Sequence, residues 1–185
     1  MVEIFLLILS IVLLLIVCAI GGALFLVFIG NLLADAPFLP VPQKIANRVA
    51  ELAYLPEGSV FYDLGSGDGR VVRAVAKAHL ETACIGVEKA PLPVLLAFLI
   101  TSRRAFPNVR FIRQDFREVT LTGGTCVFLY LFPEAMRALA PKLTTELSRG
   151  ARIISCDFTF TDRTPTAAEK IHAGRRWHTL YTYQV

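Results

Sequence analysis

The stretch "FYDLGSGDGRVV" at residues 61–72 decides the fold, because it joins two apolar runs through a loop with three glycines and two aspartates. Glycine adopts the positive φ angles that a tight loop of this kind requires. The apolar run before the loop is typical of a buried strand, and the run after it repeats apolar residues at helical spacing, at Val71, Val72, Val75 and Ala76. A strand, a glycine-rich loop and a helix in this order predict an α/β fold that binds a nucleotide-like ligand.

The rest of the chain from residue 43 onward continues the alternation of helices and strands. Strands are predicted at 59–64, 82–89, 108–115, 125–132 and 151–160, helices at 43–55, 69–80, 93–106 and 133–150, and two final strands at 168–174 and 175–185. Alternation of this kind predicts a doubly wound parallel sheet with helices on both faces, and the last two strands add an antiparallel hairpin at one edge. Pro141 lies inside the last predicted helix and is expected to kink or split it.

The composition of the loop indicates which ligand it binds. Its glycines follow the spacing G-x-G-x-G, whereas a dinucleotide-binding loop requires a further small residue at the position that Arg70 occupies. That small residue allows close packing over a pyrophosphate. Asp63 and Asp68 add negative charge to the loop. The loop therefore favours a ligand with a cationic centre, such as a sulfonium cofactor, over a diphosphate.

Further acidic residues follow the next two predicted strands. Glu88 ends the second strand, where its carboxylate can accept hydrogen bonds from both hydroxyls of a ribose. Asp115 and Phe116 follow the third strand, where the acid can accept from an adenine amino group and the ring can flank the base. Each residue alone is weak evidence for a binding site, since a carboxylate after a strand is often only a solvated cap. Together they predict an adenosine pocket with an acidic methionine end.

These motifs resemble those of the seven-β-strand methyltransferases that use S-adenosylmethionine. The resemblance rests on "DLGSGDGR", "GVEKAP" and "QDF" and covers residues 43–185. It implies a seven-stranded Rossmann-like sheet and S-adenosylmethionine as the cofactor. It assigns the cofactor-binding residues Asp63, Gly65, Ser66, Gly67, Gly69, Glu88, Asp115 and Phe116. In the family the first-strand acid and the loop hold the methionine part, the second-strand acid the ribose and the third-strand acid the adenine.

A closer resemblance includes the front of the chain. A long apolar segment, then "APFLPVPQKIANRVAEL", "DLGSGDGR" and "SRGARIISCDFTF", is similar to the membrane-anchored lysine methyltransferases of the ATP synthase c-subunit and the adenine nucleotide translocase, and to their prokaryotic relatives. "DLGSGDGR" with "GVEK" also resembles the histone lysine methyltransferase built on this fold. The resemblance implies methylation of a lysine near the bilayer surface of a membrane protein. A lipid or lipophilic small molecule as acceptor, or a non-catalytic membrane adaptor, stays an alternative.

The N-terminal segment predicts one transmembrane helix over residues 1–30. No charged residue occurs from Ile4 to Gly30, and a helix of this length exceeds a hydrocarbon core of about 30 Å. A cleaved signal peptide is the alternative, but no Lys or Arg precedes the run, which is longer than a signal core. Lys44 and Arg48 follow the span, so the positive-inside rule places the domain on the cytoplasmic side, or the equivalent internal side of an organelle membrane. Residues 31–42, with three prolines, are predicted to be a linker.

The catalytic side of the site is less well marked. The segment after the fourth strand reads "LYLFPEAM" and lacks the Asn/Asp-Pro-Pro-aromatic motif of enzymes that methylate adenine or glutamine. Tyr130 is the predicted catalytic residue, with Phe132 and Glu134 as neighbouring candidates, although both aromatic residues also suit a core strand. "PFLP" at 37–40 is expected either to cover the cofactor or to serve as a stiff linker.

Composition limits the other functions of the chain. The net charge of +4 is mild and the basic residues are scattered, so no nucleic-acid partner is expected. Four separated cysteines predict reduced thiols, and the three histidines show no metal-ligand spacing, so no metal is assigned.

Overall fold

A computed structural model describes residues 2–32 and 40–185, which belong to two compact units, Met1–Pro37 and Phe38–Val185. The first unit holds helix α1 (Val2–Leu32), which is long and apolar enough to cross a membrane over Val2–Phe25, with a mean hydropathy of 3.3. None of that stretch is buried by the described chain. The predicted linker 31–42 and the "PFLP" segment fall largely on residues 33–39, outside the described residues, so both stay predictions.

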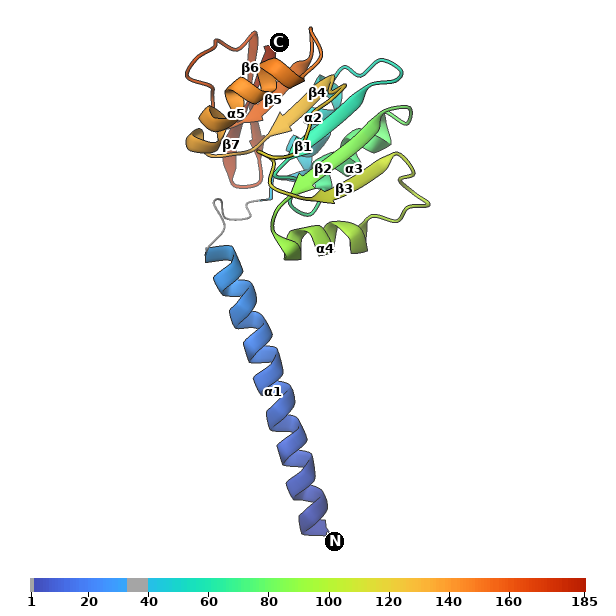
Figure 1. The fold of residues 1–185 in the computed structure, drawn as a ribbon, viewed down its shortest axis with the longest axis vertical. Coiled ribbons are helices and arrows are strands. Elements are labelled where there is room, and N and C mark those ends of the chain that lie inside the picture. Colours follow the sequence, from blue (N-terminus) through green and yellow to red (C-terminus); the bar gives the residue numbers. More distant parts are fainter. Residues whose placement is uncertain (1, 33–39) are drawn as a thin grey trace. The chain divides into compact units, whose positions relative to one another are not determined.

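The second unit is built on one seven-stranded sheet (Figure 1). Its strands are β1 (Val60–Leu64), β2 (Ala83–Glu88), β3 (Val109–Arg113), β4 (Cys126–Leu129), β5 (Arg152–Cys156), β6 (Ala167–Ala173) and β7 (Arg176–Gln184). The order across the sheet is β3-β2-β1-β4-β5-β7-β6. The first five strands are parallel, and the β6–β7 hairpin adds the antiparallel edge, as predicted. The order of the strands reverses between β1 and β4, and ligands of open α/β sheets bind at this switch point.

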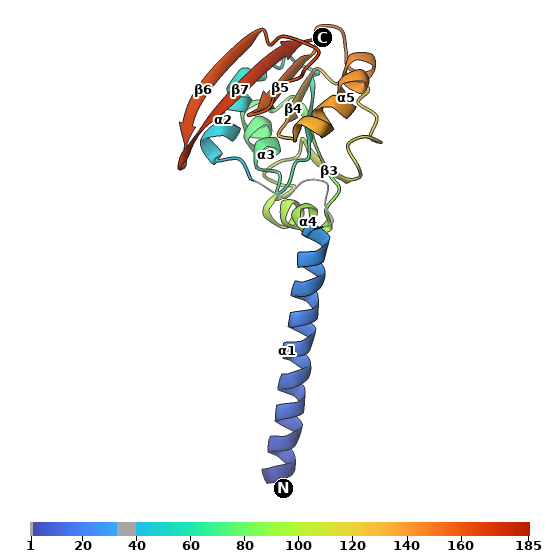
Figure 2. The ribbon, with the colours of Figure 1, turned by 90° about the vertical axis from the view of Figure 1, so that its left-hand side faces the viewer.

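Helices cover both faces of the sheet, as expected for a doubly wound fold (Figure 2). The helices of this unit are α2 (Gln43–Leu52), α3 (Arg70–Ala78), α4 (Pro91–Ile100) and α5 (Pro133–Glu146). Helices α2 and α3 pack on one face and α5 packs on the other. Alternate strand residues divide between two cores, so that Phe61 packs with α2 and α3 while its neighbour Tyr62 packs with α5. Both faces of the central strands are therefore buried, which explains why their sequences are almost continuously apolar.

Several elements end earlier than predicted. Strand β5 ends at Cys156 because Asp157 has a φ of 63°, a left-handed conformation that breaks the strand. Strand β4 ends at Leu129, so Tyr130 lies beyond the sheet hydrogen bonds. Helix α4 ends at Ile100 instead of 106. Helix α5 continues through Pro141 as a single helix, so the prediction that this proline splits the helix is wrong.

The cysteines of the second unit are free and buried. Burial raises the thiol pKa of Cys84 and Cys126 to about 12, because the low-dielectric core disfavours the thiolate. These thiols are therefore inert core residues, in agreement with the prediction. Cys18 is exposed on α1.

Candidate active site

The glycine loop is fastened to the carboxyl end of β2 by its backbone. The amides of Gly65 and Ser66 both donate to the carbonyl oxygen of Val87, at 2.8 and 3.0 Å. Gly65, Gly67 and Gly69 have φ angles of 83°, 55° and 75°, which glycine adopts without the steric cost that other residues bear. The sequence predicts a loop here because glycine adopts these positive φ angles more readily than other residues do.

Two glycines also allow a close approach of Phe111, on β3, to the loop. A Cβ atom added at Gly69 would lie 2.4 Å from the Phe111 ring, and one added at Gly86 would lie 2.6 Å from it. The Gly86 position also faces the hydroxyl of Ser66, at 2.8 Å. Phe111 therefore packs against the loop, and the absence of a Cβ atom at Gly69 and Gly86 leaves the space that its ring occupies.

Asp63 lies at the carboxyl end of β1 with 2% of its surface exposed. Among the described residues, no side chain forms an ion pair with its carboxylate. Burial raises the pKa of Asp63 well above its ordinary value, and the charges of Glu88 and Asp68 raise it further. A buried carboxylate of this kind favours a ligand that brings a positive charge or a hydrogen-bond donor.

Glu88, the last residue of β2, connects the loop with the start of α4. Its Oε2 accepts from the Gly67 amide at 3.0 Å, and its Oε1 accepts from the Ala90 amide at 2.8 Å. The carboxylate thus lies at the carboxyl end of β2 beside the glycine loop, where the sequence predicted it.

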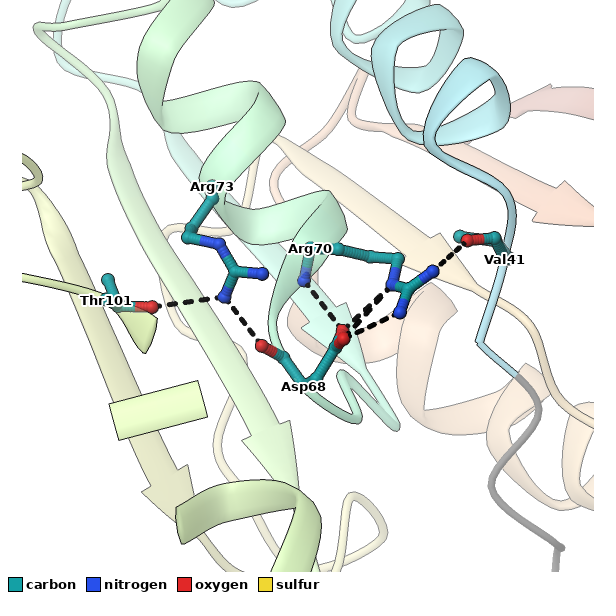
Figure 3. A network of polar contacts seen from close by, with 5 residues as sticks. All are labelled: Val41, Asp68, Arg70, Arg73 and Thr101. Carbon is teal, nitrogen blue, oxygen red and sulfur yellow. Dashed lines mark hydrogen bonds and ion pairs between the residues drawn. The ribbon is translucent and has the colours of Figure 1, made fainter. Parts of the chain in front are cut away.

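The negative charge that the sequence predicts for the loop at Asp68 is compensated by an ion pair with Arg70. Figure 3 shows Asp68 paired with Arg70, whose Nη2 lies 2.7 Å from Oδ2. Arg70 also donates to the carbonyl oxygen of Val41 at 2.8 Å, and Arg73 donates to the backbone oxygen of Asp68 at 2.6 Å. Burial opposes ionisation of Asp68, but the hydrogen bonds from Arg70 outweigh it and lower its pKa. Of the two aspartates, Asp63 at the end of β1 is therefore the one whose carboxylate forms no ion pair with a described residue.

Asp115 and Phe116 follow β3 at the same edge of the sheet. The Asp115 carboxylate forms ion pairs with Arg117 at 2.7 Å and with Lys89 at 3.3 Å. Hydrogen bonds from Arg117 are the main reason that the pKa of Asp115 lies well below its usual range. The Arg117 guanidinium lies 5.7 Å from the centre of the Phe116 ring. An adenine amino group at Asp115 would therefore have to share the carboxylate with these two cations.

On the other side of the switch point, Tyr130 lies just beyond β4. Its hydroxyl accepts a hydrogen bond from Arg176, at the start of β7. Its ring stacks on Phe158, with centroids 6.2 Å apart, and Phe132 meets the same ring edge-on at 5.6 Å. Burial raises the pKa of Tyr130, so the phenol is neutral near pH 7. A neutral phenol that already accepts from Arg176 is a poor proton acceptor and a good positioning group.

Asp157 and His178 lie beside Tyr130, since Arg176 contacts all three residues, and neither was among the residues predicted from the sequence. Oδ2 of Asp157 lies 2.9 Å from Nδ1 of His178, and Oδ1 accepts from the Thr179 amide at 2.9 Å. Asp157 follows β5 just as Glu88 and Asp115 end or follow their strands, so the same rule of acids at strand ends would have found it. His178 comes from β7, which pairs with β5, and no local motif marks it.

Cys156, Asp157 and His178 also bring three potential metal ligands within 4.8 Å of one another. Arg176, however, donates from Nε to Nε2 of His178 at 3.3 Å. A ring that accepts at Nε2 carries its proton on Nδ1, and that proton points to Asp157. Arg176, His178 and Asp157 therefore form a hydrogen-bonded chain, and we assign no metal to the cluster of Cys156, Asp157 and His178.

Comparison with known proteins identifies the family. Residues 63–167 match the ANTKMT methyltransferase domain. The chain belongs to this family. A protein-lysine N-methyltransferase of Saccharolobus islandicus is 30% identical over 80% of this chain and 93% of its own length. The lysine N-methyltransferase of the ATP synthase C-subunit from Rattus norvegicus is 34% identical over 70% of this chain, which spans only 59% of that protein.

A solved structure extends the comparison to three dimensions. The RNA methyltransferase from Salinibacter ruber in complex with S-adenosyl-L-homocysteine is 32% identical, with a TM-score of 0.69, and the match covers 79% of this chain and 93% of that one. The predicted family, fold class and cofactor, S-adenosylmethionine, are thereby confirmed.

The residues of this ANTKMT-family chain fit that cofactor. The buried hydroxyl of Ser66 has no hydrogen-bond partner among the described residues, and the buried Asp63 carboxylate lies two residues before the first glycine of the loop. Unsatisfied buried polar groups are rare in folded proteins unless a ligand or water completes them. A cofactor with a cationic methionine end and ribose hydroxyls supplies both the charge and the donors that this edge of the sheet lacks.

Proposed function

We propose that the chain is an S-adenosylmethionine-dependent protein-lysine N-methyltransferase whose acceptor is a membrane protein. The observation that carries the proposal is the position of Asp157, a partly exposed carboxylate beside a cluster of aromatic rings at the carboxyl end of β5. The aromatic rings of Tyr130, Phe132 and Phe158 can contact the aliphatic part of a lysine side chain, and the Asp157 carboxylate can bind its amine. The lysine methyltransferases among its relatives support the same acceptor class.

The cofactor side is proposed to work through binding and orientation. Asp63 and the loop Gly65, Ser66, Gly67 and Gly69 hold the methionine part, Glu88 the ribose, and Asp115 and Phe116 the adenine. When bound, S-adenosylmethionine supplies an electrophilic methyl group that a neutral amine takes up by in-line displacement. The rate then depends mainly on how well amine and methyl are aligned.

The acceptor side is proposed to prepare the amine. A lysine enters protonated, and its nitrogen must lose a proton before it can attack. Asp157 is the proposed proton acceptor, because its Oδ2 lies 2.9 Å from His178, which fixes the orientation of the carboxylate. Tyr130, the residue predicted from the sequence, is proposed as a positioning residue that Arg176 holds through its hydroxyl. His178, with 1% of its surface exposed, acts only through Asp157.

The location of the enzyme belongs to the same proposal. Helix α1 is proposed to cross the membrane once, with the catalytic unit on the cytoplasmic side or the equivalent internal side of an organelle. Lys44 and Arg48, which follow the span, support this orientation through the positive-inside rule. An anchored enzyme meets acceptors at the bilayer surface at a high effective concentration.

RNA is the second candidate acceptor, because the solved relative from Salinibacter ruber is an RNA methyltransferase. The segment after β4 lacks the Asn/Asp-Pro-Pro-aromatic motif described above, which argues against an adenine target. A lipid acceptor shares every cofactor residue with the lysine proposal and differs only in the product.

One labelling experiment separates these acceptors. Membranes from cells that lack the chain are incubated with the purified full-length protein and S-adenosylmethionine that carries a labelled methyl group. We expect label on a lysine of an integral membrane protein, identified by mass spectrometry, and no label with Asp157→Asn. Label that appears only in RNA or in extracted lipid would refute the lysine proposal. Absence of cofactor binding by calorimetry would leave the non-catalytic adaptor.

A further inference from the structure

Helix α4 has an exposed apolar surface that its own domain does not cover. Leu95, Phe98, Leu99 and Ile100 each expose more than half of their surface, and Leu99 exposes 73%. Only Pro93, Val94 and Ala97 are buried against the sheet. A helix that is apolar on all sides normally lies in a protein core or in a membrane. Among the described residues of the second unit, nothing covers the outer side of α4, so the helix presents a binding surface for an apolar partner.

The chain around α4 is strongly basic. From residue 89 to residue 113 there are five basic residues and no acidic one: Lys89, Arg103, Arg104, Arg110 and Arg113. Arg103 and Arg104 follow the helix, are exposed, and form no ion pair with any described residue. An apolar helix with cationic residues beside it complements an anionic lipid leaflet, in which acyl chains and phosphate groups lie next to each other.

Contacts at both ends of α4 fix it relative to the cofactor site. At its start, the Ala90 amide donates to Glu88 at 2.8 Å. At its end, Arg73 donates to the Thr101 hydroxyl at 3.1 Å and also to the backbone oxygen of Asp68 in the glycine loop (Figure 3). Figures 1 and 2 show α4 beyond the ends of the strands, apart from the layer that α2 and α3 form. A partner bound to α4 therefore has a defined distance from the cofactor loop.

We propose that α4 is a membrane-contact helix that inserts Leu95, Leu99 and Ile100 into the interface of an anionic leaflet, while Arg103 and Arg104 bind phosphate groups of the lipids. The helix offers a partner protein or RNA no polar side chain before Thr101, whereas RNA recognition needs stacking or hydrogen-bonding groups. A bilayer requires neither.

The proposal rests on α1 as a membrane span, and it does not depend on methyl transfer. Ten residues separate Leu32 from Gln43, so even a fully extended chain keeps the catalytic unit within about 40 Å of the end of the span. The second unit therefore meets the same bilayer at a high effective concentration. A short helix whose own affinity for lipid is low can then bind the bilayer. Contact through α4 adds an orientation that an anchor at the end of a linker does not provide.

Spin labelling of the full-length protein tests the contact. In a Cys18→Ser background, where the remaining cysteines are buried, one nitroxide is attached at Leu99→Cys and a control at Glu81→Cys, an exposed site at the opposite end of β2. Both are measured in lipid nanodiscs that contain about one third phosphatidylglycerol in phosphatidylcholine. We expect the label at 99 to collide readily with oxygen and several-fold less with a water-soluble nickel chelate than the label at 81.

Each other outcome overturns the proposal. A label at 99 that meets the nickel chelate as often as the label at 81 means that α4 is in water. A label shielded from both reagents means that protein, either α1 or a second copy, covers α4. Arg103→Gln with Arg104→Gln should restore nickel access at 99, and no change would exclude the lipid phosphate contacts. Methylation is measured separately in the same discs, so a water-exposed α4 with intact lysine methylation would refute this inference and leave the proposed function standing.

Discussion

At the scale of single residues, we expect the buried carboxylate of Asp63 to lower the stability of the cofactor-free protein and to strengthen cofactor binding. Its pKa is raised by burial and by the nearby charges of Glu88 and Asp68. Ionisation of Asp63 therefore lowers the free energy of unfolding of the cofactor-free protein. We expect Asp63→Asn to raise the melting temperature of the cofactor-free protein near pH 7. The same change removes a charged hydrogen bond worth about 1.5–3 kcal/mol, so the Kd for S-adenosylmethionine should rise roughly tenfold to a hundredfold.

The pH dependence of unfolding provides a second test of Asp63. A carboxyl with a raised native pKa stabilises the fold below its unfolded pKa, and that contribution is lost as the pH rises through the native value. The free energy of unfolding of the wild type, measured relative to that of Asp63→Asn, should therefore fall as the pH increases from about 4. Glu57→Gln, at an exposed carboxylate, is the control and should follow the wild type. Identical curves for all three proteins would contradict the burial argument.

Asp157 is the residue on which the chemistry of the acceptor side depends. Its φ of 63° is tolerated by Asn, so Asp157→Asn should keep the backbone while it removes the proton acceptor. We expect kcat to fall by about 10²–10⁴ with an unchanged Kd for the cofactor. His178→Asn should lower kcat less and should also shift its pH profile, because it only orients Asp157. Equal kcat in Asp157→Asn and wild type would assign proton transfer to another group.

At the scale of elements, the glycine loop depends on space as well as on conformation. Gly69 and Gly123 have almost equal φ angles, 75° and 74°, but an added Cβ meets the Phe111 ring only at Gly69 and open space at Gly123. Gly123→Ala should therefore cost about 1–2 kcal/mol of backbone strain. Gly69→Ala should cost a further 1–3 kcal/mol, roughly, from overpacking, and should weaken cofactor binding. Denaturant unfolding and calorimetry measure both; equal losses would show that Phe111 moves aside freely.

The same elements show what the sequence could predict. Residues 61–72 contain the strand, the turn and the helix of the site in one stretch, so local chemistry was enough to place Asp63 and the glycines. Asp157 and His178 are brought together by the pairing of β5 with β7, a contact between distant parts of the chain that no local pattern encodes. The end of β4 was missed because apolar residues continue past Leu129 into the aromatic cluster, where they pack on Phe158.

At the scale of the whole molecule, the two compact units predict a separation of stability from targeting. The second unit has its own sheet and both hydrophobic cores, and the relative from Saccharolobus islandicus matches the chain over 93% of its own length. We expect a chain that begins at Phe38 to fold and to bind S-adenosylmethionine with the Kd of the full-length protein. Loss of the high effective concentration at the bilayer should lower methylation of a membrane-embedded acceptor by about 10²-fold or more.

A peptide with the acceptor lysine is the matched control for that truncation. Because the peptide is dissolved in water, the full-length and truncated enzymes should methylate it at equal rates, and only the membrane-embedded acceptor should separate them. If α4 binds the leaflet, vesicles with anionic lipids should restore part of the lost activity, and neutral vesicles should restore less. Full activity of the truncated chain on the embedded acceptor would mean that α1 determines where the enzyme resides and contributes nothing to the encounter with its lysine.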